Sequence, residues 1–434
     1  MGYSHPQLPL RFRLIQTLWS VLWFWISAKY ATSLLFSSNL KLLSAINSII
    51  TLVLGLTLFL LGWMQGRKIE LKGIIWLFFF CFSVMLSMVF SPFITEQNFL
   101  RAWGTFLANV VIVLSIWSVA QVRFSLSFYF LSAGRSFVFG VICALVVLLI
   151  TRGFRYTLTV EELRFGDPEL LHPNAVGALA GLGFFMTFYL KIFRNRVISV
   201  LITILLFFVL ILTISKTAIL GVLVGSFISL ALSNTSGKGW LVALIILAGT
   251  VAYGFLGDSL RFAWENYMSS PELIETLSGR TRLWEVLFSL INRRPWLGYG
   301  FTTMKDLMLD YMRVIGFNLP TVVHAHNAYI DVLFNSGYLG LFFFCILVLR
   351  VLVLVIKMVV KYNRNRLTAF WIGCFTFLLI RSWTEASLDL STDFLIMMWI
   401  SFGIEKVIFS PQSNNGYSPV AQLLPSPRRR RAGF

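Results

Sequence analysis

The sequence predicts an all-α membrane protein with about 12 transmembrane helices and a large extracytoplasmic loop that carries short amphipathic helices. Three observations support this fold class. Hydrophobic residues make up 58% of the 434 positions and charged residues only 12%. The apolar residues form runs of about 20 residues bounded by charges, the length that crosses a bilayer. The charges between the runs are distributed unevenly. A soluble core of this length cannot hide so much apolar surface, so the excess must face lipid.

The predicted spans follow the apolar runs in chain order. The first run comes after Arg11 and Arg13 and lacks a small-residue cleavage site, so we interpret it as a retained anchor. The eighth and twelfth runs are short, which leaves the count open by one or two. The predicted spans are Leu14–Phe36, Leu42–Met64, Leu71–Phe93, Ala102–Val122, Gly134–Ile150, Pro173–Leu190, Val197–Ile214, Thr217–Leu232, Trp240–Leu256, Gly337–Val360, Leu367–Trp383 and Phe394–Phe409.

The distribution of charge predicts the orientation. Because spans alternate sides, each loop can be assigned to one face. The face that holds both termini carries most of the basic excess and only two acids, Glu70 and Glu405, whereas the opposite face is nearly balanced. The positive-inside rule places the basic face in the cytoplasm. The net charge of +18 therefore predicts contact with anionic membrane lipids and not with nucleic acid.

These assignments divide the chain into five parts. Residues 1–13 form a cytoplasmic N-terminus, residues 14–256 hold the first nine spans with an outer loop at 151–172, and residues 257–336 form a large periplasmic loop. Residues 337–409 hold the last three spans, and residues 410–434 form a basic cytoplasmic tail. The large loop contains TRLWEVLFSLI and NAYIDVLFN, whose apolar spacing predicts amphipathic helices lying over the membrane face.

Some chemistries are disfavoured by what the spans contain. The four cysteines lie in apolar runs without metal-type spacing and are interpreted as small buried hydrophobes. No Asp or Glu occupies the middle of a predicted span, and Glu405 lies near an end. Ion-coupled transporters usually need carboxylates within the membrane, so their absence disfavours such a pump. Arg350 is an interior cation that we expect to snorkel or to pack against neighbouring carbonyls.

Polar residues concentrate at the predicted outer face in four stretches. Pro173 suits the first helical position, so the helix is expected to open toward His172. A helix N-terminus and arginine side chains both suit phosphate, and a neutral histidine can accept a proton from a hydroxyl. The combination predicts a hydroxyl attacking a sugar carried on a lipid diphosphate. The stretches are LRFGDPELLHPNAVGALAG with Arg164, His172 and Asn174, SKTAILG with Lys216, SGRTRLWE with Arg280 and Arg282, and HAHNAYIDVLFNSGYLG with His324, His326 and Asn327.

Each feature also has a purely structural interpretation. A histidine near a helix end is often a cap, and loop arginines are usually solvated. Arg282 can pair with Glu285, and Lys216 can anchor a helix to headgroups. Gly337 and Gly340 commonly indicate close helix packing. The His-x-His pair can ligate a metal, but no nearby Cys, Asp or Glu set completes a site, so no metal and no cofactor are predicted.

The motifs resemble those of the O-antigen ligase and O-antigen polymerase superfamily. His326-Asn327, nine residues, then Gly337-x-x-Gly340 is similar to that family's His-Asn/Ser-x9-Gly-x-x-Gly signature. Ser278-Gly279-Arg280 with Trp284, followed by RPWLGYG at 294–300, resembles its other block. The order of Arg164, Ser215-Lys216 and the large loop also agrees. Lys216 is a departure, because the family often has Ser-Arg there and lysine lacks the bidentate fork.

The resemblance implies an inverting, metal-independent glycosyltransferase of the bacterial inner membrane with a periplasmic active site. Its donor would be an undecaprenyl-diphosphate-linked glycan, and its acceptor a hydroxyl of lipid A core, another glycan or a protein. The implied catalytic residues are His326, as base or acceptor-positioning group, and Arg280, as a pyrophosphate contact. The implied substrate-binding residues are Arg164, His172, Lys216, Arg282 and Asn327.

Two other classes remain open from the sequence. A transporter or permease of a small solute needs a water-lined path with polar residues in several spans, and the sequence shows few. If the protein were only a membrane scaffold, the histidines and arginines of the four stretches would have no role. Ligase, polymerase and protein glycosyltransferase are not distinguished, because the loop surface that selects the acceptor cannot be decoded from spacing.

Overall fold

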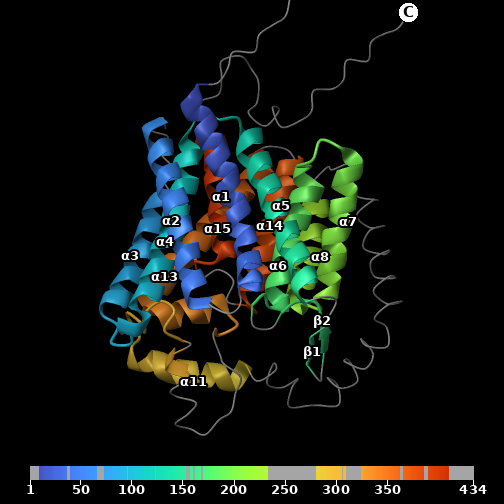
Figure 1. Cartoon of the computed structure of the whole chain (residues 1–434). Coiled ribbons are helices and arrows are strands. Elements are labelled where there is room, and N and C mark those ends of the chain that lie inside the picture. Colours follow the sequence, from blue (N-terminus) through green and yellow to red (C-terminus); the bar gives the residue numbers. More distant parts are fainter. Residues whose placement is uncertain are drawn as a thin grey trace, which may run out of the picture.

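A computed structural model of the chain describes residues 9–36, 40–65, 73–94, 96–122, 124–152, 157–159, 162–167, 170–232, 280–304, 306–308, 324–361, 365–385 and 390–409. Within them the fold is a helical bundle, shown in Figure 1. The helices are α1 (Leu10–Leu35), α2 (Leu40–Gln65), α3 (Gly73–Val89), α4 (Glu96–Gln121), α5 (Leu126–Arg152), α6 (Pro173–Leu190), α7 (Arg196–Leu212), α8 (Lys216–Leu232), α11 (Arg280–Arg293), α13 (Ala328–Lys361), α14 (Arg366–Ser382) and α15 (Thr392–Phe409).

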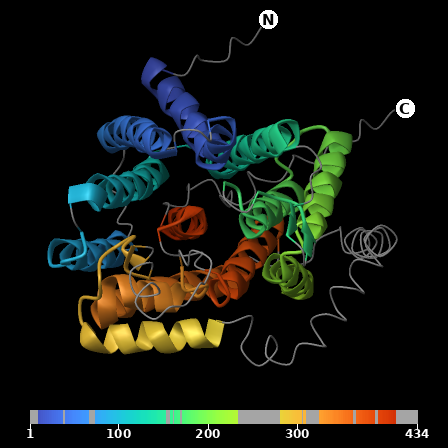
Figure 2. The same ribbon diagram turned by 60° about the horizontal axis from the view of Figure 1, so that its bottom comes forward.

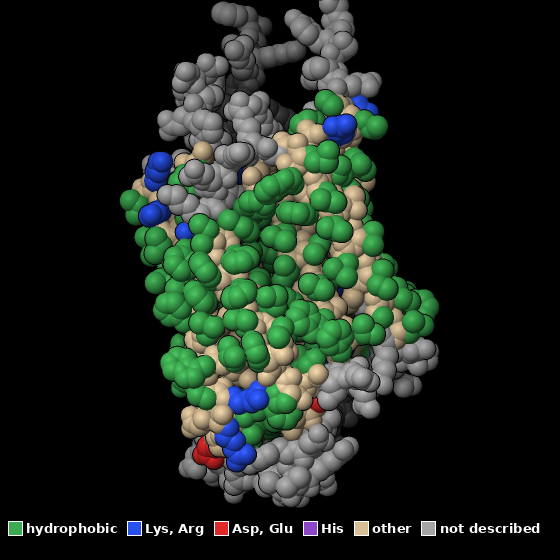
Figure 3. All heavy atoms as spheres, turned by 90° about the vertical axis from the view of Figure 1, so that its left-hand side faces the viewer, with side chains coloured by type: hydrophobic (Ala, Val, Ile, Leu, Met, Phe, Trp, Pro, Cys, Tyr) green, Lys and Arg blue, Asp and Glu red, His purple; other side chains and the backbone are tan. Residues whose placement is uncertain are grey.

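The predicted helical membrane fold is confirmed at this level. Five described helices are long and apolar enough to cross a membrane, within α2, α4, α5, α6 and α13, and α3, α7 and α8 are shorter apolar helices. Large apolar side chains are exposed on their flanks, as on α2 at Leu42, Ile46, Ile49 and Val53. Figure 3 shows an apolar band with lysine and arginine side chains at its two ends. The span predicted at Trp240–Leu256 lies outside the described residues.

Helix α15 is the centre of the bundle. Every residue from Thr392 to Val407 is buried, and Figure 2 shows the other helices arranged around it. Aromatic packing joins it to its neighbours: the rings of Trp23 on α1 and Trp399 on α15 lie 4.8 Å apart, and those of Phe130 on α5 and Trp399 lie 5.0 Å apart. Such ring pairs stabilise a core beyond the area they bury.

One end of the bundle carries the extramembrane elements, and we call it the α11 end (Figure 1). Helix α11 crosses beneath the bundle there. Its buried face consists of Leu283, Leu287, Leu290 and Ile291, which confirms the amphipathic helix expected for TRLWEVLFSLI. The loop at 151–172, predicted to lie outside, differs from a purely helical expectation, because strands β1 (Thr157–Thr159) and β2 (Glu162–Arg164) form an antiparallel hairpin in it.

Helix α13 begins nine residues earlier than the predicted span, at Ala328, and bends at Gly337. Gly337 has a φ of 64°, and a Cβ there would lie 2.3 Å from the carbonyl of Trp296. Glycine at this bend therefore allows the backbone at Trp296 to approach closely, and its role is not limited to helix packing. Tyr299 N–H and Gly300 N–H donate to the carbonyls of Phe334 and Asn335, at 2.9 Å each. The RPWLGYG segment thus satisfies carbonyls that the bend releases from the helix ladder.

Two expectations about buried side chains are corrected by long-range contacts. Arg350 forms an ion pair with Glu405 instead of snorkelling, and Glu405 is fully buried and accepts from Gly73 N–H at 3.1 Å. The carboxylate near the end of the last span is therefore neutralised inside the protein. All four cysteines are free, but only Cys374 is buried as expected: Cys81 and Cys143 are half-buried, and Cys345 is exposed on α13.

Candidate functional site

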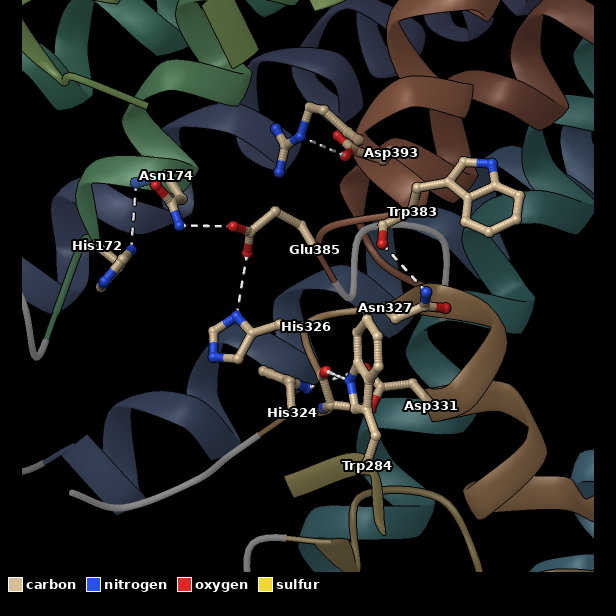
Figure 4. A network of polar contacts seen from close by, with 12 residues as sticks. His172, Asn174, Trp284, His324, His326, Asn327, Asp331, Trp383, Glu385 and Asp393 are labelled. Carbon is tan, nitrogen blue, oxygen red and sulfur yellow. Dashed lines mark hydrogen bonds and ion pairs between the residues drawn. The ribbon is translucent and has the colours of Figure 1, made fainter. Parts of the chain in front are cut away.

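A chain of polar contacts crosses the α11 end and joins His326, Asn174 and Arg164. Figure 4 shows the part of it from His326 through Glu385 to Asn174. His326 Nδ1 lies 3.5 Å from Oε2 of Glu385. Oε1 of the same carboxylate accepts from Asn174 Nδ2 at 2.7 Å. Asn174 Oδ1 accepts from Arg164 Nη2 at 2.5 Å, and Arg164 Nε donates to the carbonyl of Thr213 at 3.1 Å. Segments from α6, the α13 entry and the α14 exit therefore converge.

The local backbone presents His326 toward this chain of contacts. His326 has a φ of 52°, in the left-handed region, which a non-glycine residue adopts only where its surroundings hold it. Asn327 follows as the N-cap of α13, with Oδ1 accepting from Tyr329 N–H and Ile330 N–H. The imidazole stays 41% exposed, while the Glu385 side chain is 13% exposed. One face of the histidine is thus fixed by a carboxylate and the other is open.

Asn327 was expected to contact substrate, and its described contacts are internal. Besides capping α13, its Nδ2 donates to the carbonyl of Trp383 at 3.1 Å, and the residue is buried. The ring of Trp383 also lies 5.5 Å from that of Tyr329. These contacts hold the exit of α14 against the entry of α13, which brings Glu385 to His326.

Glu385 is the central site residue that the sequence did not single out. It stands three residues after Ser382, where α14 ends, and its backbone N–H donates to the carbonyl of Arg381 at 2.8 Å. The available signal was a carboxylate just outside an apolar run, on the side predicted to face outward. Its partners lie 59 and 211 residues away in the chain, so no local spacing could reveal them.

His172 caps helix α6, and this limits its role as a phosphate contact. As expected, α6 begins at Pro173. Nδ1 of His172 accepts from Asn174 N–H at 3.2 Å, and the His172 carbonyl accepts from Ala175 N–H and Val176 N–H. The first amides of the helix are therefore already engaged by His172, which disfavours the anion site expected at this helix terminus. Partial burial and the nearby guanidinium of Arg164 lower the pKa of His172, more than Glu385 raises it.

The remaining predicted residues lie around this centre or outside the described side chains. Arg280 is the first residue of α11, but its side chain and that of Arg282 lie outside what the structure describes. Lys216 is the exposed first residue of α8, just after the Thr213 carbonyl that Arg164 contacts. His324 faces a different carboxylate from His326: its Nδ1 lies 3.7 Å from Oδ2 of Asp331. The two histidines thus have separate partners.

The fold and the site together define a helical membrane protein whose polar site lies at one end of its bundle, beside an amphipathic surface helix. Residues 201–345 match the family described as O-antigen ligase, which confirms the resemblance drawn from the motifs. The matched segment contains α11, His326 and Gly337-x-x-Gly340.

A curated relative agrees with this family. A Rickettsia felis protein described as "Putative polysaccharide ligase" is 25% identical to this chain over 118 residues. The alignment covers 26% of this chain and 28% of that protein. The chain therefore matches about a quarter of the relative's length.

Proposed function

We propose that the protein is an enzyme that transfers a glycan from an undecaprenyl-diphosphate carrier to a hydroxyl acceptor on the outward, periplasmic face of the membrane. The observation that carries the proposal is the connection of His326, through Glu385 and Asn174, to the guanidinium of Arg164. It links a candidate base to a cation through two intervening side chains at one end of the bundle. The O-antigen ligase family match supports the same chemistry.

In the proposed reaction the acceptor oxygen attacks the anomeric carbon of the lipid-linked sugar. The hydroxyl proton passes to Nε2 of His326, the nitrogen opposite the one that faces Glu385. The bond from the anomeric carbon to the diphosphate oxygen breaks, and its electron pair leaves with the diphosphate. A single displacement of this kind inverts the configuration at that carbon.

Glu385 has a defined role in this scheme. A carboxylate beside Nδ1 fixes the tautomer that leaves Nε2 free to accept, and it stabilises the imidazolium that forms. The distance of 3.5 Å is long for a hydrogen bond, but such contacts commonly shorten when substrate binds. Arg164, Lys216, Arg280 and Arg282 are the cations proposed to stabilise charge on the departing diphosphate, without a metal ion.

The test is glycan transfer by the full chain reconstituted in vesicles that contain labelled undecaprenyl-diphosphate glycan. We expect His326→Ala to abolish product while leaving the amount of inserted protein unchanged. Normal product from that variant would discard the proposed base. Solute uptake by the vesicles without any glycan transfer would instead indicate a permease.

A second variant tests the proposed pyrophosphate contact. Arg280→Lys replaces a bidentate fork with a point charge, so we expect it to lose more transfer than Arg13→Lys at the opposite end of the bundle. Activity equal to the parent protein would show that the guanidinium of Arg280 is dispensable.

An experiment in cells identifies the class of acceptor. In a deletion strain, loss of all polymer from the lipopolysaccharide core would indicate a ligase, and a band with a single repeat would indicate a polymerase.

A further inference from the structure

Both backbone polar groups of Ala325, one residue before His326, are held by side chains. Its N–H donates to Oδ1 of Asp331 at 2.7 Å, and its carbonyl accepts from Nε1 of Trp284 at 2.8 Å. Ala325 and Asp331 are buried. Asp331 belongs to the first turn of α13, whereas Trp284 lies on α11. Figure 4 shows Trp284 and Asp331 beside His324 and His326.

This arrangement explains how a strained residue is maintained. His326 adopts a φ of 52°, a conformation that costs a non-glycine residue on the order of 1–3 kcal/mol unless its surroundings hold it. The hydrogen bond from Trp284 fixes the peptide that enters the strained residue, and the one to Asp331 fixes the peptide before it. The Asn327 side chain fixes the start of α13 that follows. Rotation of the entering peptide would turn the imidazole away from Glu385.

We propose that Trp284 and Asp331 are positioning residues that hold the imidazole of His326 in its reactive orientation, and that Trp284 thereby couples α11 to the reaction. This inference rests on the proposed glycan transfer. Neither residue is assigned contact with substrate: both act through the backbone of Ala325. Since Arg280, a proposed donor contact, lies one helical turn before Trp284 on α11, a movement of α11 would be transmitted to the base.

Substitutions at Asp331 distinguish the effect of its hydrogen bond to Ala325 from the effect of its charge. Oδ1 makes the hydrogen bond to Ala325, and Oδ2 faces His324. An asparagine retains an oxygen that can accept from Ala325 N–H, whereas an alanine does not. A role in positioning therefore predicts that Asp331→Asn retains most activity and that Asp331→Ala loses it.

The experiment measures kcat and KM for glycan transfer by the reconstituted full chain. For Trp284→Phe and Asp331→Ala we expect kcat to fall at least tenfold with KM for the lipid-linked donor nearly unchanged, because misplacing a reacting group by about 1 Å can cost a hundredfold. Trp284→Phe keeps the ring and removes the donor, so it remains informative where Asp331→Ala fails to fold. Trp63→Phe, on the exposed flank of α2, is the matched control and should retain parental kcat.

The possible outcomes distinguish a failure of this inference from a failure of the proposed function on which it rests. A parent protein without transfer activity would refute the proposed function itself. An active parent, an inactive His326→Ala and fully active Trp284→Phe and Asp331→Ala would overturn the positioning role alone. Asp331→Asn as impaired as Asp331→Ala, or a raised KM at constant kcat, would also overturn it, because either result requires a role other than backbone geometry.

Discussion

Oε2 of Glu385 lies 3.5 Å from Nδ1 of His326, although 59 residues separate them in the chain. The other oxygen of Glu385 accepts from Asn174, so the carboxylate cannot rotate freely. It is held by one polar neighbour and directed at the other. A histidine that faces a fixed carboxylate through one nitrogen is prepared to accept a proton at the second.

We expect Glu385→Gln to reduce kcat for glycan transfer by about 10- to 100-fold, since the neutral amide no longer stabilises the imidazolium. Protein amount and thermal stability should change little, because the amide preserves the shape. Initial rates at saturating donor and acceptor measure the effect. A variant with unchanged kcat would remove Glu385 from the proposed mechanism.

Asn174 is expected to act through Glu385 and Arg164 and not independently. Its amide accepts from Arg164 and donates to Glu385, so Asn174→Ala should release both side chains. A double-mutant cycle of Asn174→Ala with Glu385→Gln measures this coupling, and we expect the two losses to be clearly less than additive. Additive effects would show that the amide serves some separate purpose.

Sequence patterns predicted those parts of the structure that depend on residues close together in the chain. The start of α6 at Pro173 followed from proline chemistry, and the amphipathic α11 followed from apolar spacing. The ion pair of Arg350 with Glu405 and the contact of Glu385 with His326 did not, because both are made between helices distant in the chain. A side chain's partner across a bundle depends on the packing of whole helices, which periodicity leaves undetermined.

The bend at Gly337 predicts a steric requirement for glycine. An added Cβ would meet the Trp296 carbonyl at 2.3 Å in a backbone with a φ of 64°. Gly337→Ala should therefore lower stability by roughly 2 kcal/mol or more. Gly104→Ala on α4 is the control, because nothing lies within 4 Å of a Cβ there, and we expect a neutral or slightly stabilising effect of up to about 1 kcal/mol. Thermal unfolding in detergent compares the two, and equal effects would contradict the requirement.

His172 predicts a dependence of stability on pH. Its pKa in the folded protein is lowered, chiefly by partial burial and by Arg164, so the unfolded chain takes up the proton first as the pH falls. The contribution of the His172 cap is therefore fully present above the ordinary histidine pKa of about 6.5 and is lost as the pH falls from there through the lowered value. His172→Asn keeps an oxygen that can cap α6 and does not titrate. The melting temperature of this variant should decline less between pH 7 and pH 5 than that of the parent, and parallel declines would contradict the assignment.

The last prediction concerns how the ion pair of Arg350 and Glu405 affects the stability of the protein. Glu405 is fully buried, so Arg350→Met leaves a carboxylate without its cation in a medium of low dielectric constant. Breaking a buried pair in this way costs about 3–5 kcal/mol, whereas removing both charges costs much less. Arg350→Met with Glu405→Gln should restore much of the loss, because the amide oxygen can still accept from Gly73 N–H.

The control is Arg101→Met, which breaks the exposed pair with Asp306 and should cost no more than about 1 kcal/mol. Melting temperatures in one detergent rank the variants, and a double variant less stable than Arg350→Met would show that the ion pair itself stabilises the bundle beyond the cost of an isolated charge.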